Sequence, residues 1–229
     1  MDHKRALILG ASRGLGLGLA RELLARGWQV VGTVRRPSEA ADTLRAANPG
    51  RFGIETVDIN APEQLRDLHG RLQDTRFDLL FVNAGVLTSP DKPIGEVSHQ
   101  AFVHEMTTNA FSPVRAADTL LGLVQPDGTI GFMTSQLGSI ANNTSGGYEL
   151  YRASKAALNM LVRSFVARLS DRRRTVLLLH PGWVRTDMGG PNAAIDVATS
   201  VRGLADVIEA KHGSRALAFL DYQGRELPW

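Results

Sequence analysis

The sequence predicts an α/β fold with a doubly wound, Rossmann-type parallel sheet of about seven strands and helices on both faces. Short apolar runs alternate with longer helical patterns along the whole chain. The short runs lack polar alternation, which is typical of strands that are covered on both faces. Repetition of strand, helix and strand also requires right-handed crossover connections, which place the strands parallel to one another.

Each element follows from its local pattern. Aliphatic and β-branched runs predict buried strands at residues 6–9, 28–34, 52–57, 77–82, 129–133, 175–179 and 216–220. Helical patterns fill the intervals at residues 15–26, 38–47, 62–74, 99–123, 150–170 and 195–211. No repeat, low-complexity tract or long linker divides the chain, so we expect residues 1–229 to form a single domain.

Composition excludes several classes of protein. An apolar content of 43% with 21% charged residues is that of a folded globular chain. The chain has no cysteine, which excludes disulfides, thiolate metal sites and cysteine nucleophiles. It has no apolar run long enough to span a membrane and no signal-peptide pattern, so we expect a cytoplasmic protein that does not bind membranes.

The charged residues do not indicate nucleic acid or metal binding. The net charge is only +3, and the basic run Arg172 to Arg174 lies at a predicted helix end, where cations complement the helix dipole. The six histidines include no pair at helical spacing with a third ligand in view. We therefore expect neither a nucleic-acid partner nor a bound metal.

A glycine-rich turn follows the first predicted strand and leads directly into a helix. Its spacing, G-x-x-x-G-x-G over residues 10–16, would let the backbone approach a pyrophosphate at the helix N-terminus. Close packing of strand on helix could also explain the glycines. The residues expected to bind a dinucleotide here are Gly10, Ser12, Arg13, Gly14, Leu15 and Gly16.

The same turn contains G-x-S-x-G, the nucleophile elbow of α/β-hydrolases, for which His180 or His212 could act as the base. The hydrolase elbow is preceded by a segment that supplies part of the oxyanion hole. Too few residues precede Gly10 to provide such a segment, so the sequence favours dinucleotide binding over hydrolysis.

The end of the second predicted strand indicates NADP rather than NAD. An acidic residue that would bind the ribose hydroxyls of NAD is expected near this position, but the strand ends in Arg35 and Arg36 instead. With Arg13, these guanidinium groups could bind a dianionic 2′-phosphate. The alternative is a solvated arginine pair at a strand end.

Tyr151 and Lys155 share one face at the start of a predicted helix. A phenol has a pKa near 10 and is a poor acid–base group at neutral pH, but a nearby ammonium group stabilises the phenolate. Taken alone, the pair is better explained as a half-buried tyrosine beside a solvated lysine.

Further polar motifs lie at the carboxyl ends of predicted strands, where ligands of doubly wound sheets bind. They are Val82-Asn83-Ala84-Gly85, Thr134-Ser135 and Pro181-Gly182-Trp183-Val184-Arg185-Thr186. Together with the glycine turn and Tyr-x-x-x-Lys, these motifs resemble the short-chain dehydrogenase/reductase family over about residues 6–188. The stretch from Asn143 to Met160 is similar to the C-factor and sniffer-type carbonyl reductases.

The resemblance implies a hydride-transfer site. Tyr151 would protonate the carbonyl oxygen, Lys155 would lower the pKa of Tyr151 and hold the nicotinamide ribose, and Ser135 would orient the substrate. Asn109 matches the asparagine of a proton relay, although a polar residue that kinks a helix near Pro113 explains it equally well. Residues implied to border the cofactor are Asp58, Ile59, Asn83, Ala84, Gly85, Pro181, Val184 and Thr186.

The sequence departs from the family pattern at two places. Leu9 stands where a threonine is usual, and Tyr151 lies three residues further from Ser135 than is usual. Tyr148 has the usual spacing, but its i+4 residue is Arg152, which is a poorer partner for ribose hydroxyls. We therefore assign Ser135 with Tyr151 and place a three-residue insertion within residues 142–147, with Tyr148 as a candidate wall of the substrate pocket.

These observations predict an NADPH-dependent carbonyl reductase that acts on a small aldehyde or ketone, or that oxidises the corresponding alcohol. A non-catalytic dinucleotide-sensing or signalling protein on the same fold is the alternative. The resemblance also implies possible homo-oligomers. The substrate is not specified by any motif.

Overall fold

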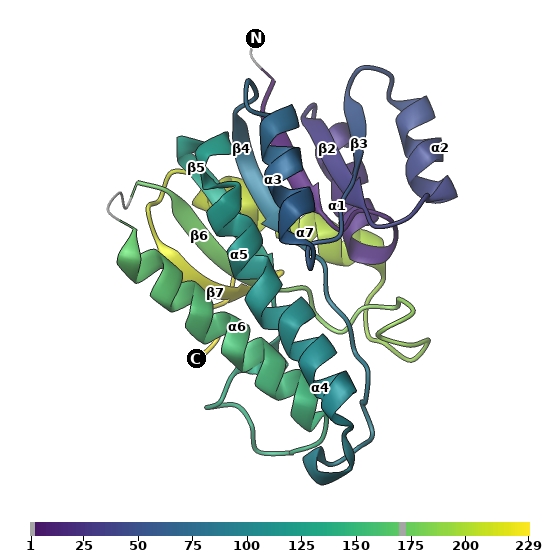
Figure 1. Ribbon diagram of the computed structural model, residues 1–229, viewed down its shortest axis with the longest axis vertical. Helices are drawn as coiled ribbons and strands as arrows, with labels where there is room; N and C mark the ends of the chain where they lie inside the picture. Colours follow the sequence, from purple (N-terminus) through teal and green to yellow (C-terminus); the bar gives the residue numbers. More distant parts are fainter. Residues whose placement is uncertain (1–2, 170–172) are drawn as a thin grey trace.

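The computed structural model describes residues 3–169 and 173–229. Its centre is a seven-stranded, fully parallel sheet in the order β3-β2-β1-β4-β5-β6-β7 (Figure 1). The strands are β1 (Arg5–Leu9), β2 (Gln29–Val34), β3 (Phe52–Thr56), β4 (Phe77–Val82), β5 (Val124–Met133), β6 (Thr175–His180) and β7 (Leu217–Asp221). This is the doubly wound α/β fold that the apolar runs predict.

Helices cover both faces of the sheet. Figure 1 shows α3, α5 and α6 in front of the strands and α1 and α7 behind them. Their bounds are α1 (Gly14–Ala25), α2 (Glu39–Ala47), α3 (Pro62–Arg71), α4 (His99–Met106), α5 (Ser112–Thr119), α6 (Glu149–Arg168) and α7 (Val197–Lys211). Predicted residue Ser170 at the end of α6, and Arg172 of the basic run, lie outside the described residues.

Each face of the sheet has its own apolar core. Behind the sheet, Leu19 and Leu23 of α1 and Leu204 of α7 are fully buried against the strands. In front, Leu65 of α3 and Phe165 of α6 are buried. Burial on both faces explains why the strands show continuous apolar runs instead of alternation.

Most predicted elements differ from the structure by one to three residues at their ends, and two differ more. The helix expected over residues 99–123 is divided into α4, a π-helical segment (Thr107–Phe111), α5 and a short 3₁₀ turn. The strand expected to start at residue 129 begins at Val124, because Val124 pairs with Phe77 before a register shift restores regular pairing at Leu79. The polar residues 125–128 resemble a turn in the sequence, which hid this first pair.

The sheet topology fixes where a ligand can lie. The chain moves outward from β1 to β3, then crosses back to β4 on the other side of β1. The crossover connections therefore diverge beyond the carboxyl ends of β1 and β4, leaving a crevice there. Within the described residues, no helix is both long and apolar enough to cross a membrane.

Candidate active site

A cavity of about 480 Å³ lies at this crevice. It brings together the glycine turn after β1, the end of β2, the segments after β3 and β4, the end of β5, the start of α6 and the loop after β6. The predicted site residues in its wall are Gly10, Ser12, Arg13, Gly14, Leu15, Arg35, Asp58, Ile59, Asn83, Ala84, Gly85, Tyr151, Lys155, Pro181 and Thr186. Segments far apart in the sequence thus form one site.

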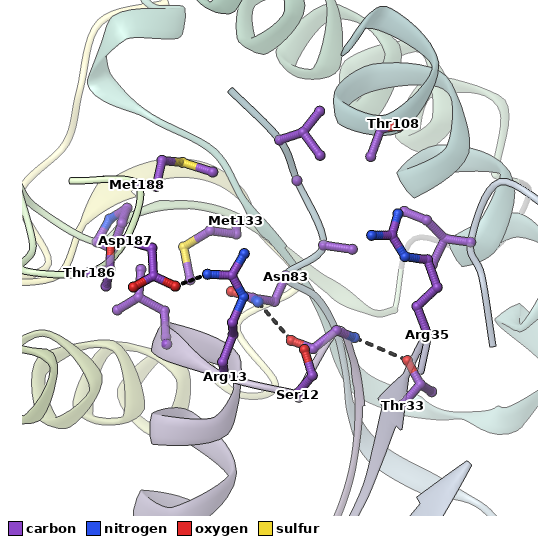
Figure 2. Close-up of a pocket in the computed structure, with 18 of the residues that line it drawn as sticks. Ser12, Arg13, Thr33, Arg35, Asn83, Thr108, Met133, Thr186, Asp187 and Met188 are labelled. Carbon is purple, nitrogen blue, oxygen red and sulfur yellow. Dashed lines mark hydrogen bonds and ion pairs between the residues drawn. The ribbon is translucent and has the colours of Figure 1, made fainter. Parts of the chain in front are cut away.

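The glycine turn is fixed by hydrogen bonds with two side chains, Thr33 of β2 and Asn83 directly after β4. Gly10, with φ of +93°, donates its N–H to Oγ1 of Thr33 at 3.0 Å, and its carbonyl oxygen accepts from Nδ2 of Asn83 at 2.8 Å (Figure 2). In the part of the chain that the structure describes, no side chain caps the N-terminus of α1 and its first turn carries no acidic residue. Its free N–H groups and dipole therefore suit an anionic ligand.

Gly16→Ala tests how tightly this turn is built. A Cβ at Gly16 would lie 2.0 Å from the Gly10 carbonyl oxygen and 2.6 Å from Nδ2 of Asn83. We expect the variant to lose about 1–3 kcal/mol of stability and to bind nucleotide more weakly, because the turn must move. Thermal unfolding measures the loss. Gly70→Ala in α3, where a Cβ would meet nothing within 4 Å, is the control and should unfold no earlier than the parent.

The three predicted arginines occupy different places. Arg35 lies in the cavity wall, whereas the exposed Arg36 does not. Arg13 forms an ion pair with Asp187, which comes from the loop after β6 on the opposite side of the cavity (Figure 2). Of the three arginines predicted to bind a phosphate, Arg13 and Arg35 line the cavity in this structure. Both Arg35 and Arg36 follow the last residue of β2, Val34, and both are exposed.

Tyr151 and Lys155 face the same cavity from the first turns of α6. Lys155 is buried, donates from Nζ to the carbonyl oxygen of Met133 at 3.0 Å, and lies 5.7 Å from the centroid of the Tyr151 ring. Burial lowers the pKa of Lys155 to about 8. Burial also raises the pKa of Tyr151, and the nearby negative charge of Glu105 acts in the same direction. The net direction is opposite to the lowering that was expected from Lys155, because desolvation is the larger effect.

Asn109 lies at the centre of the π-helical segment and is fully buried. Its Oδ1 accepts from Val86 N–H at 2.8 Å, while Nδ2 donates to Val86 O at 2.8 Å and to Ser154 Oγ at 3.0 Å. A Cβ at Gly85 would lie 3.3 Å from Oδ1 of Asn109 and 3.5 Å from Nζ of Lys155. Asn109 thus ties the loop after β4 to α6 beside Lys155.

Ser135 and Ser139 have different environments. Ser135 follows cavity residue Thr134, and its Oγ accepts from Leu137 N–H at 3.1 Å, which leaves the hydroxyl hydrogen available to another acceptor. Ser139 is 1% exposed, and its Oγ accepts from Asn142 N–H at the start of the following loop. This loop, residues 142–147, is exposed throughout, and Tyr148 after it has a left-handed φ of +50°.

Some predicted residues are not among those that line the cavity. These are Gly16, Arg36, Asn109, Ser135 and Val184. Val184 is buried and pairs with Ile195. The wall also contains residues to which the sequence analysis assigned no role, namely Thr33, Asn60, Thr108, Arg185 and Asp187. Of these, Arg185 already belongs to the motif that ends at Thr186, and Asp187 could have been found by extending that motif by one residue.

Comparison with known proteins gives the family. The short chain dehydrogenase family model matches residues 4–195. The chain belongs to the short-chain dehydrogenase/reductase family of oxidoreductases. A short-chain dehydrogenase/reductase from Burkholderia multivorans with bound NADP is 52% identical, with a TM-score of 0.97 over the full length of both chains.

Two further relatives bear out the predicted subgroup. The C-signal protein of Myxococcus xanthus is 44% identical over 154 residues, which is 66% of this chain and 92% of that protein. The carbonyl reductase Sniffer of D. melanogaster is 33% identical, with a TM-score of 0.88 and full coverage of both chains. Membership of this family of oxidoreductases favours the dinucleotide interpretation of the glycine turn over the hydrolase alternative.

Proposed function

We propose that this protein is an NADPH-dependent carbonyl reductase whose single domain reduces a small aldehyde or ketone or oxidises the corresponding alcohol. One observation carries the proposal: Tyr151 and Lys155 line the same cavity as the uncapped glycine turn. A proton donor and an anion-binding turn in one cavity suit hydride transfer from a dinucleotide. The NADP-bound relative and the carbonyl reductase relative support the same assignment.

The cavity wall offers suitable groups for each part of the cofactor. The α1 N-terminus would hold the pyrophosphate, and Arg35, at a strand end without an acidic residue, would hold the 2′-phosphate. Oδ1 of Asn60 is buried without a hydrogen-bond partner in the described chain, so it could accept from the adenine amino group. Nζ of Lys155 has donors beyond its bond to Met133 for the nicotinamide ribose hydroxyls.

Residues of the chain would supply the proton that the carbonyl oxygen of the substrate takes up. When bound, NADPH supplies the hydride. Because the pKa of Tyr151 is raised, its phenol is protonated at neutral pH, which is the form that can donate to a carbonyl oxygen. The free hydroxyl hydrogen of Ser135 would bind the same oxygen and orient it. Asn109 would keep the loop after β4 against the site.

Cofactor preference tests the assignment of Arg35. We expect NADPH to bind more tightly than NADH by one charge-assisted contact, about 1.5–3 kcal/mol or roughly 10- to 100-fold. Arg35→Asp should remove or reverse this preference, measured by fluorescence titration of both cofactors. Arg36→Asp makes the same charge change outside the cavity wall and should keep most of the preference. Equal affinities of the parent protein for the two cofactors would contradict the assignment.

A second candidate function has one supporting observation. The Myxococcus xanthus relative is named C-signal, which is consistent with a signalling protein that binds a dinucleotide without turning it over. The two functions differ in what they need from Tyr151, since binding alone does not require a proton donor. Steady oxidation of NADPH with a panel of aldehydes and ketones supports the reductase, and tight binding without turnover on any of them supports the signalling protein.

A further inference from the structure

A buried acidic residue on α4, one turn before Asn109, has no role in the mechanism above. Glu105 is the only buried residue of α4, and it is fully inaccessible. Burying a carboxyl group is costly unless it is hydrogen-bonded or paired with an opposite charge. The two carboxyl oxygens of Glu105 are therefore expected to have hydrogen-bond or ion-pair partners.

One oxygen of Glu105 has such partners. Oε2 accepts from both the N–H and the Oγ1 hydroxyl of Thr88, at 2.8 and 2.5 Å. Thr88 lies in the loop after β4, two residues beyond Val86, which Asn109 holds by its main chain. The two side chains, four residues apart, thus fix alternate residues of this loop.

The other oxygen has none. Oε1 of Glu105 is buried without a hydrogen-bond partner among the described residues. The negative charge of Glu105 raises the pKa of Lys155 and the pKa of Tyr151. Its electric field therefore reaches both groups of the proposed catalytic pair. Helix α4 packs against α6, which carries both of them.

Among residues 3–169 and 173–229, no other buried anion is found in the surroundings of Lys155. Its own helix contributes Tyr151, the end of β5 contributes the neutral carbonyl of Met133, and the π-helical segment contributes the neutral amide of Asn109. The remaining charged residues in the cavity wall are Arg13, Arg35, Asp58, Arg185 and Asp187, on the loops after β1, β2, β3 and β6. Asp187 is 78% exposed and already paired with Arg13.

We propose that Glu105 is a positioning residue of the catalytic site: anchored by Thr88, its carboxylate keeps the buried Lys155 protonated at neutral pH. This inference rests on the proposed reductase function for its consequence, but its physical content can be tested without turnover. A protonated Lys155 carries the positive charge that the proposed mechanism needs beside Tyr151 and the nicotinamide ribose.

The chain makes a direct test practical because it has only four lysines, Lys4, Lys92, Lys155 and Lys211. Full-length protein labelled with ¹³C at lysine Cε gives few NMR signals, and the Lys155→Met spectrum identifies the Lys155 signal by its absence. We expect Lys155 to titrate near pH 8 in the parent protein. In Glu105→Gln, which keeps an acceptor for Thr88 but removes the charge, the midpoint should fall by about one pH unit.

Three variants complete the test. Glu96→Gln removes an exposed charge and should leave the midpoint unchanged, and Glu105→Asp keeps the charge and should stay closer to the parent than Glu105→Gln. If Glu105→Gln does not fold, Thr88→Val loosens the carboxylate and should lower the midpoint by a smaller amount. An unchanged Lys155 midpoint in Glu105→Gln, or in Thr88→Val in its place, overturns the proposal.

The reductase rate gives an independent reading. In Glu105→Gln the pKa of Tyr151 also falls, so carbonyl reduction should lose activity at a lower pH than in the parent protein. If the NMR midpoint moves while the parent protein reduces no carbonyl compound, the proposed function fails and the role of Glu105 in holding the Lys155 proton stands. If the parent protein reduces carbonyl compounds but Glu105→Gln changes neither the Lys155 titration nor the pH dependence of the rate, the role of Glu105 is wrong and the proposed function stands.

Discussion

Tyr151→Phe is expected to lower carbonyl-reductase turnover by roughly 10²- to 10⁴-fold, the usual contribution of a positioned proton donor. The ring remains and only the hydroxyl is lost, so the cavity keeps its shape and NADPH affinity should change little. Steady-state kinetics and a cofactor titration on the same variant separate the two effects.

Tyr148→Phe is the matched control, since it deletes the same hydroxyl three residues earlier. Tyr148 is 43% exposed and precedes the first turn of α6, so this variant should keep the greater part of the activity. If Tyr148→Phe is the inactive variant instead, the assignment of Ser135 with Tyr151 is wrong and the loop of residues 142–147 holds no insertion.

Lys155→Met is expected to shift the pH dependence of alcohol oxidation to higher pH. Oxidation requires the Tyr151 phenolate, and removing a neighbouring positive charge raises the pKa of the phenol further. Because Lys155 itself has a pKa of about 8, it is charged mainly below that pH. The difference between parent and variant should therefore be largest below pH 8, with a shift of about one pH unit.

Lys92→Met, which removes an exposed lysine, should leave the profile unchanged. An unchanged profile in Lys155→Met, together with normal NADPH affinity, would show that Lys155 does not act on Tyr151. A loss of NADPH affinity with an unchanged profile would assign Lys155 to the ribose alone.

The fold could be predicted from the sequence because its signals are local. Apolar runs such as Leu177 to Leu179 are buried on both faces, and Gly10 meets a requirement of the turn itself. Strand ends were less certain, and Val124 was missed because its pairing with Phe77 depends on a distant strand. The π-helical segment at Asn109 also depends on contacts with Val86 and Ser154 that no local pattern shows.

Site residues that belong to a local sequence motif could be predicted. Site residues whose role depends on contacts between distant segments could not. Tyr151 and Lys155 were found from their spacing. Glu105 was missed because an acidic residue in a helix is ordinarily solvated, and only the tertiary structure shows that it is buried and bonded to Thr88. The pairing of Arg13 with Asp187 was missed for the same reason, since the two residues come from opposite sides of the cavity.

Hydride transfer itself is the most direct test of the central claim. A single-turnover reaction of the protein with NADPH carrying deuterium at both C4 positions, and with each carbonyl compound of the panel, can be analysed by mass spectrometry of the alcohol product. The account predicts one deuterium on the carbinol carbon with the parent protein and very little such product with Tyr151→Phe. Equal labelled product from both proteins, or none from the parent protein with any compound while NADPH is bound, would contradict it.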